Sequence, residues 1–354
     1  MHGRAHAVGL GTSNKGPRYG GVAFEGACIP LEEISRAKSR IKEFIIENTP
    51  VVMCRGLEDL GHPNVHLKLE NLQVTSSFKV RGAANALCRT AASSRKPGRT
   101  IITASAGNHG QAVALVAQEL GMKAMIVVPE TTPMVKIARI REHGPELVLH
   151  GATFDEAEQY AKKLAQVRAL DYLSAYNDPR VIAGHGTIGL EVLAQLGDVD
   201  RIIVPVGGGG LISGISSAVK QLHPRVEIIG VESEASPAMY KSISAGKLIN
   251  VSVKDSIADG LSGNIEPGSI SFGITKRCVD RMVLVTEESI RKAIRLLWEK
   301  DGQVVEGAGA VTVAAMLEKK VPPSEKDTVA IISGGNIDID LFRAVLAERT
   351  KGNA

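Results

Sequence analysis

Short runs of β-branched and aliphatic residues alternate with helix-like stretches along most of this chain, and this alternation constrains the fold more than any other feature. Parallel strands need a long crossover, usually a helix, between them. The pattern therefore predicts an α/β fold whose mostly parallel sheets are covered by helices. An amphipathic opening helix is expected after Pro30, with its apolar face made by Ile34, Ala37, Ile41 and Ile45. The expected strands are Val65–Leu69, Ile101–Thr103, Lys123–Val128, Leu147–Leu149, Arg201–Val206, Val226–Val231, Met282–Val285 and Thr328–Ile332.

The bulk composition is that of an aliphatic-cored enzyme. The 354 residues suffice for two domains or one large one. Hydrophobic residues make up 44% and aromatic residues 3%, with 37 glycines to form tight turns. The formal net charge is +4, but Lys and Arg are dispersed, so no nucleic-acid partner is expected. No apolar stretch reaches membrane-spanning length, so no membrane partner is expected either.

The cysteines and the first residues carry little information about function. Cys28, Cys54, Cys88 and Cys278 show no paired spacing, so the sequence predicts neither a disulfide framework nor a zinc site. Reduced cytoplasm is the expected compartment. Residues 1–22 have no apolar leader core and contain several turn formers, so we expect a flexible extension there.

Lys79 is the first candidate for chemistry. It follows an expected strand, within the apolar, small-residue segment Ser76–Ala83. Desolvation in such a place lowers the pKa of a lysine, and a neutral amine forms a Schiff base with an aldehyde. Taken alone, a lysine near a helix start is far more often a solvated or snorkelling side chain.

Three glycine-rich turns, each after an apolar run, accompany this lysine. Gly207–Gly210 follows an expected strand and precedes a helix from Leu211, so its backbone NH groups suit a phosphate. The alternative is a flexible turn or tight packing of the strand against the helix. A dinucleotide fingerprint fails, because Ile212 and Ser213 stand where its last glycine is needed. Ser105–Gly110 has the same strand-to-helix setting, and Ser333–Asn336 follows the last strand.

In this order, the four segments resemble those of fold-type II pyridoxal-phosphate enzymes, most closely the threonine dehydratase and serine racemase branch. The resemblance covers about Pro30 to Leu346. It implies pyridoxal 5'-phosphate as cofactor and two parallel-sheet α/β domains with the active site between them. The large domain would comprise 23–98 and 178–354, and the small domain 99–177. Asp178-Pro179 agrees with this boundary, because it is a good N-cap and first-turn pair for a new helix.

The resemblance also implies the role of each site residue. Lys79 would carry the cofactor and act as the catalytic base, Asn108 would bond the cofactor's 3-oxygen, and the Ser333 hydroxyl would meet the ring nitrogen. The implied cofactor-binding residues are Phe78, Lys79, Asn108, Gly207, Gly208, Gly209, Gly210, Leu211, Glu306 and Ser333. The implied substrate-carboxylate loop is Ser105, Ala106, Gly107, Asn108 and His109.

Two departures bear on the branch. Serine racemases of this family carry a serine before the loop glycine as the second acid–base group, whereas this chain has Ala106 there. Alanine cannot carry a proton, so we expect elimination to survive and two-base racemisation to be lost. Racemases also bind a divalent ion through a glutamate matched by Glu232, but Ala238 stands where a second carboxylate is needed. We therefore assign no metal, with Glu232 as a possible ligand only.

The reaction implied is the dehydration and deamination of L-threonine or L-serine, an amino-acid substrate, to a 2-oxo acid and ammonia. A cytoplasmic homo-oligomer, either dimer or tetramer, is expected. Other dehydratase substrates remain open, namely 3-hydroxyaspartate, phenylserine or a hydroxyectoine-derived amino acid, as does serine racemisation. Outside enzymes, the alternative is a protein that binds pyridoxal phosphate or another small ligand without turnover.

Overall fold

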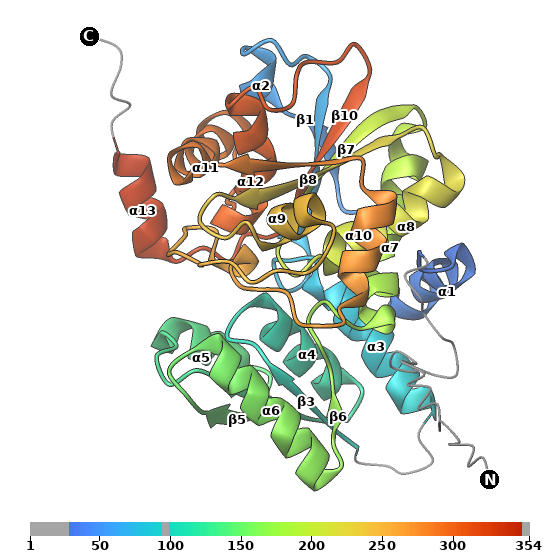
Figure 1. Cartoon of the computed structure of the whole chain (residues 1–354), viewed down its shortest axis with the longest axis vertical. Coiled ribbons are helices and arrows are strands. Elements are labelled where there is room, and N and C mark those ends of the chain that lie inside the picture. Colours follow the sequence, from blue (N-terminus) through green and yellow to red (C-terminus); the bar gives the residue numbers. More distant parts are fainter. Residues whose placement is uncertain (1–27, 94–98, 349–354) are drawn as a thin grey trace, which may run out of the picture.

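The strands of this protein form two sheets (Figure 1). The structure is a computed structural model that describes residues 28–93 and 99–348, so the extension expected at 1–22 lies outside the described residues. The strands are β1 Val51–Met53, β2 Val65–Leu69, β3 Thr100–Ala104, β4 Lys123–Val128, β5 Glu146–Leu149, β6 Asp171–Tyr172, β7 Val199–Pro205, β8 Glu227–Ser233, β9 Arg281–Val285 and β10 Asp327–Ile332. One sheet has the six-strand order β1-β2-β10-β7-β8-β9, and the other has the four-strand order β5-β4-β3-β6.

Helices cover these sheets. They are α1 Leu31–Ile41, α2 Arg55–Glu58, α3 Lys79–Ser93, α4 Asn108–Glu119, α5 Met134–Arg141, α6 Phe154–Arg168, α7 Pro179–Leu196, α8 Gly210–Leu222, α9 Ala238–Ala245, α10 Ile270–Cys278, α11 Glu287–Asp301, α12 Gly307–Leu317 and α13 Ile339–Ala347, with short 3-10 turns η1 Glu70–Leu72 and η2 Asp259–Leu261. In Figure 1 the smaller sheet, with α4, α5 and α6, lies below the larger one. No helix within 28–93 or 99–348 is long and apolar enough to cross a membrane.

The central strands carry apolar residues on both faces, because both faces are covered by helices. On β7, Ile203 joins the core formed with α11 and α12. Its neighbours Ile202 and Val204 point the other way, into the core formed with α7 and α8. Strand neighbours among the described residues are parallel except for β1 with β2. The predicted mostly parallel α/β fold is therefore confirmed.

The predicted strands are present, with bounds that agree to within two residues. The predicted N-cap at Asp178 is also confirmed, because its carboxylate accepts the backbone NH of Arg180 at 2.8 Å. The sequence did not predict β1 and β6, which have three and two residues. The opening helix ends at Ile41, so its expected last member, Ile45, lies beyond it.

Four buried charges fix the beginning of α3, the helix whose first residue is Lys79. The Arg81 guanidinium donates to both oxygens of Glu70, at 2.7 and 2.8 Å, and to both oxygens of Glu191, at 2.7 and 2.9 Å. Lys68 also donates to Glu191, at 2.6 Å. Burial alone would lower the pKa of Arg81, but the facing Glu70 carboxylate, followed by Glu191, raises it. The network thus joins β2 and η1 to α3 and α7 with its charges balanced.

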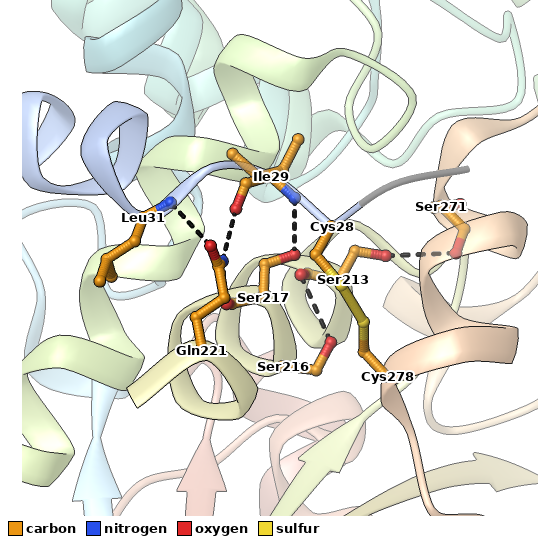
Figure 2. Close-up of a disulfide and its surroundings, with 9 residues drawn as sticks. All are labelled: Cys28, Ile29, Leu31, Ser213, Ser216, Ser217, Gln221, Ser271 and Cys278. Atoms are coloured by element: carbon orange, nitrogen blue, oxygen red, sulfur yellow. Dashed lines mark hydrogen bonds between the residues drawn. A yellow bond between two sulfur atoms is a disulfide. The ribbon is translucent and has the colours of Figure 1, made fainter. Parts of the chain in front are cut away.

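The prediction of no disulfide was wrong, because Cys28 and Cys278 form one (Figure 2). Cys278 is the last residue of α10, and Cys28 lies three residues before α1. The segment between Cys28 and α1 is bound to α8, because Ile29 donates its backbone NH to the Ser217 hydroxyl at 3.0 Å. The Gln221 side-chain amide returns a hydrogen bond to the Ile29 carbonyl at 2.8 Å. The sequence could not show this pairing, since the two cysteines are 250 residues apart and meet only because both segments pack on α8.

We predict that this disulfide stabilises the fold, because it closes a loop of 250 residues in the unfolded chain. Cys28→Ser should lower the free energy of unfolding by about 2–4 kcal/mol, measured by denaturant titration. Cys88→Ser, at a free and half-buried cysteine, is the matched control and should change little. A reductant should destabilise the parent protein and leave Cys28→Ser unchanged. Identical unfolding midpoints with and without reductant would contradict a stabilising disulfide.

Candidate active site

The segments that follow the carboxyl ends of β3, β7 and β10 form part of the wall of a cleft of about 770 Å³. Ligands in open α/β sheets usually bind at such strand ends. The cleft wall includes the start of α3 and α4 and the loop that contains η2. Both sheets therefore contribute to one concave site.

Lys79 lies half-buried in the cleft wall as the first residue of α3. Its Nζ donates to the Ala175 carbonyl at 3.2 Å and lies 5.1 Å from the centroid of the Phe78 ring. Burial lowers the pKa of Lys79 to about 8, and the nearby Glu306 carboxylate opposes that shift. Phe78 is itself buried, with its ring edge-on to His185 at 4.7 Å between centroids. The cleft thus holds an amine that is partly neutral near physiological pH.

The glycine run Gly207–Gly210 forms a loop of free backbone donors between β7 and α8. No acceptor in the described ranges takes the NH groups of Gly207 to Leu211. These groups, at a helix N-terminus without a side-chain cap, suit an anion such as a phosphate.

Packing also requires glycine in this run. A Cβ on Gly208 would lie 2.4 Å from the Tyr176 ring, and Gly209 has a φ of +84°. A substitution at either position would therefore disturb the loop itself as well as any phosphate bound to it. The loop is held further by Ser271 on α10, whose hydroxyl donates to the Gly208 carbonyl at 2.6 Å.

A second set of free donors begins α4. Among the described residues no acceptor takes the backbone NH groups of Ala106, Asn108 or His109, and Gly107 at the N-cap offers no side chain. The His109 ring is buried, and its two nitrogens have no hydrogen-bond partner within 28–93 and 99–348. Burial, with a smaller contribution from Lys79, lowers the pKa of His109 to about 3. His109 is therefore a neutral ring, and the loop offers backbone donors to a carboxylate.

Ser333 directly follows β10 and lies beside the lysine segment. Its backbone carbonyl accepts the NH of Phe78 at 3.1 Å, and Gly335 donates its NH to the Ser76 carbonyl at 2.9 Å. The buried Ser333 hydroxyl makes no hydrogen bond to any described residue. It is a free neutral donor and acceptor in the cleft wall.

Glu306 and Asn108 face each other in the same wall. The Glu306 Oε1 accepts a hydrogen bond from the Asn108 Nδ2 at 2.8 Å. Burial raises the pKa of Glu306 to about 7, with a smaller contribution from Asp259. The carboxyl group is therefore protonated in part at neutral pH.

The possible metal ligand, Glu232, lies outside the cleft lining. Its two oxygens accept the backbone NH groups of Met239 and Tyr240, at 2.9 and 2.6 Å, at the start of α9. Burial raises the pKa of Glu232 to about 8. No group of three or more His, Cys, Asp or Glu side chains gathers within the described part of the chain to hold a metal ion.

Apart from Glu232, the structure brings all the site residues predicted from sequence together in one cleft. They are Phe78, Lys79, Ser105, Ala106, Gly107, Asn108, His109, Gly207, Gly208, Gly209, Gly210, Leu211, Glu306 and Ser333. Sequence reasoning missed Tyr176, which covers the glycine loop, and no local pattern marks it. It also missed Asn336, which lines the cleft and ends one of the glycine-rich segments. Its position beside Ser333 was a usable signal.

The donors present fit a phosphate-bearing aldehyde. The free NH groups of the Gly207–Gly210 loop suit the phosphate, and a Cβ on any of its four glycines would lie within 3 Å of a neighbouring atom. The Lys79 amine suits the aldehyde, and the unpartnered Ser333 hydroxyl suits a ring nitrogen. The chemistry of the cleft residues thus fits pyridoxal phosphate.

Comparison with known proteins agrees with this match. Residues 42–334 match the family model described as pyridoxal-phosphate dependent enzyme. An L-threonine ammonia-lyase of Thermotoga maritima is 42% identical over 318 residues, covering 90% of this chain and 78% of the relative.

Two solved structures are also similar. The processed threonine deaminase isoform 2 of Solanum lycopersicum has a TM-score of 0.82 at 34% identity, covering 94% of this chain and 91% of that one. The serine racemase of Dictyostelium discoideum has a TM-score of 0.80 at 35% identity, covering 88% of this chain and 100% of that one. By sequence, fold and site chemistry, this chain belongs to the pyridoxal-phosphate dependent enzymes of fold type II.

Proposed function

We propose that this enzyme is an ammonia-lyase that dehydrates L-threonine and L-serine to a 2-oxo acid and ammonia. The proposal rests on two residues that line the cleft. Lys79 supplies an amine, whereas Ala106 has only a methyl group at the position where the racemases of this family carry a serine. One base suffices for elimination, whereas two-base racemisation needs a second proton carrier. The L-threonine ammonia-lyase named above supports the same reaction.

In this proposal the residues of the cleft divide the work. When bound, pyridoxal phosphate supplies the electron sink for charge that develops at the substrate's α-carbon. The NH groups of Gly207 to Leu211 would hold the phosphate, and the free NH groups of Ala106, Asn108 and His109 would hold the substrate carboxylate. Lys79, once free, removes the α-proton with its partly desolvated amine.

The groups around the cofactor ring tune this chemistry. Ser333 offers a neutral hydroxyl to the ring nitrogen, and a hydroxyl cannot keep that nitrogen protonated as an aspartate would. Negative charge at the α-carbon would then be held less strongly, which would favour loss of the β-hydroxyl as water, its proton supplied through the cofactor phosphate. Asn108 would bond the 3-oxygen, and Phe78 and Glu306 would complete the wall.

The domain division and assembly are part of the same proposal. All strands of the four-stranded sheet lie within 99–177, which supports that range as the small domain and 23–98 with 178–354 as the large one. We also propose a homo-oligomer, a dimer or a tetramer, with sedimentation analysis as its measurement.

A cytoplasmic location is proposed for this amino-acid enzyme, but the Cys28–Cys278 disulfide weighs against a compartment that keeps thiols reduced. Blocking thiols in intact cells before extraction decides the point. Free Cys28 and Cys278 in that sample fit the cytoplasm, and a formed disulfide fits an oxidising compartment.

We predict that L-serine yields pyruvate and ammonia with little D-serine, and that L-threonine yields the corresponding 2-oxo acid. The measurement combines 2-oxo acid release across a panel of hydroxyamino acids with chiral analysis of residual serine at partial conversion. Ala106→Ser should introduce some racemisation, because it restores a proton carrier. If the parent enzyme forms D-serine as fast as pyruvate, the lyase proposal is wrong and the enzyme is a racemase. Exclusive turnover of another hydroxyamino acid would correct the substrate.

We predict that capture of pyridoxal phosphate by the cofactor-free enzyme follows the pKa of Lys79, about 8. Below that pKa the lysine is an ammonium ion and does not attack an aldehyde, so the capture rate should rise about tenfold per pH unit and level off above the pKa. Stopped-flow absorbance gives the rate, and Lys79→Ala should show no lysine-linked band.

Nα-acetyl-lysine is the control amine for this measurement. Its ordinary pKa is about 10.4, so its rate should still be rising where that of the enzyme is constant. Equal pH profiles for the enzyme and the free amine would show that the cleft does not perturb Lys79.

A further inference from the structure

Asn336 lies in the cleft three residues after Ser333, and its side-chain amide makes two donor contacts. Its Nδ2 donates to the Thr75 carbonyl at 2.8 Å and to the Asn108 Oδ1 at 2.8 Å. The Asn108 Nδ2 then donates to Glu306 at 2.8 Å. The two amides and the carboxyl group thus form a single chain of hydrogen bonds along the cleft wall.

The direction of this chain is set at Thr75. A backbone carbonyl only accepts, so the amide nitrogen of Asn336 must face it, and the second hydrogen of that nitrogen points to Asn108. Asn108 must therefore turn its oxygen toward Asn336. Its NH₂ end is left facing Glu306 and the cleft.

We propose that Asn336 is a positioning residue that orients the amide of Asn108, so that an NH₂ group rather than an oxygen meets the 3-oxygen of the cofactor. This inference rests on the proposed function, which gives Asn108 that contact. The 3-oxygen of a lysine-linked cofactor carries negative charge. A donor stabilises such an oxygen, and an amide oxygen turned toward it repels it.

The remaining side-chain contact of Asn336 has a lesser part in this orientation. Its Oδ1 accepts from Arg139 on α5 at 3.4 Å, a long hydrogen bond from a half-buried side chain. The Thr75 carbonyl already fixes the amide without it. Arg139→Met should therefore have a much smaller effect than any loss of the Asn336 donor.

Two Asn336 variants test the inference. Asn336→Leu removes the donor without adding charge, and Asn336→Asp keeps the shape but replaces the donor by an acceptor. In both, the Asn108 oxygen loses this donor, and the partly protonated Glu306 carboxyl group can hold either end of the Asn108 amide. The 3-oxygen then loses its fixed donor and attracts the neighbouring proton more strongly. The visible band of the lysine-linked cofactor should then titrate at a pH higher by about one unit, and cofactor affinity should fall about tenfold.

Asn64→Leu is the matched control. The Asn64 amide also donates to backbone carbonyls, those of Ser324 at 3.2 Å and Glu325 at 2.8 Å, outside the cleft lining. It should show a similar loss of thermal stability with an unchanged absorbance titration and unchanged cofactor affinity.

The outcomes separate the positioning role from its rivals. An unchanged titration and affinity in folded Asn336→Leu would overturn it and leave Asn336 a structural residue. A shift in Asn336→Asp alone would also overturn it, because added charge then explains the result. These readouts are spectroscopic, so a parent enzyme that binds the cofactor but releases no 2-oxo acid would refute the proposed function and leave this test valid.

Discussion

The buried group of Lys68, Glu70, Arg81 and Glu191 is the interaction on which the rest of this structure depends. The side chains of these four residues are at most 1% exposed, and they carry two positive and two negative charges. Removing one member of such a group typically costs about 3–5 kcal/mol, because its partner is left buried and uncompensated. Arg81 stands two residues after Lys79, so the network that balances these charges also fixes where the amine enters the cleft.

The beginnings of α4 and α8, which both lack side-chain caps, line the same cleft as Lys79. Gly107 precedes α4 and Gly209 precedes α8, and neither supplies the oxygen that a Ser, Thr or Asp would offer at an N-cap. The first NH groups of both helices therefore remain for ligands. Other helices do have a side-chain cap, such as Thr153 for α6 and Asp178 for α7, although α1, α2, α5, α9, α10 and α12 also begin without one. The uncapped starts in the cleft thus suit two anions of one bound pair, the cofactor phosphate and the substrate carboxylate.

The sequence predicted the strands and the glycine-rich turns well, because apolar runs such as residues 124–128, all of them buried, have a pattern of their own. It predicted poorly whatever depends on distant segments meeting. Strand β6 has two residues and is a strand only because β3 lies beside it. The Cys28–Cys278 disulfide needs α8 between its ends. Arg and Glu side chains are usually exposed, so the sequence suggests surface positions for Arg81 and Glu191. Only the fold shows that both are buried and paired with each other. Asn336 was visible in its segment, but its donor direction depends on the carbonyl of Thr75.

The central claim is that Lys79 carries the cofactor at the meeting point of four separate segments. Lys136 and Lys162 also line the cleft, but each is held in an ion pair, with Asp259 and with Glu266 respectively. Borohydride reduction of the cofactor-loaded enzyme, followed by proteolysis and mass mapping, tests the claim directly, because reduction makes the lysine link permanent. The account predicts one phosphopyridoxyl group, on the peptide that contains Lys79. The same group on Lys136 or Lys162, or no modified lysine at all, would contradict it.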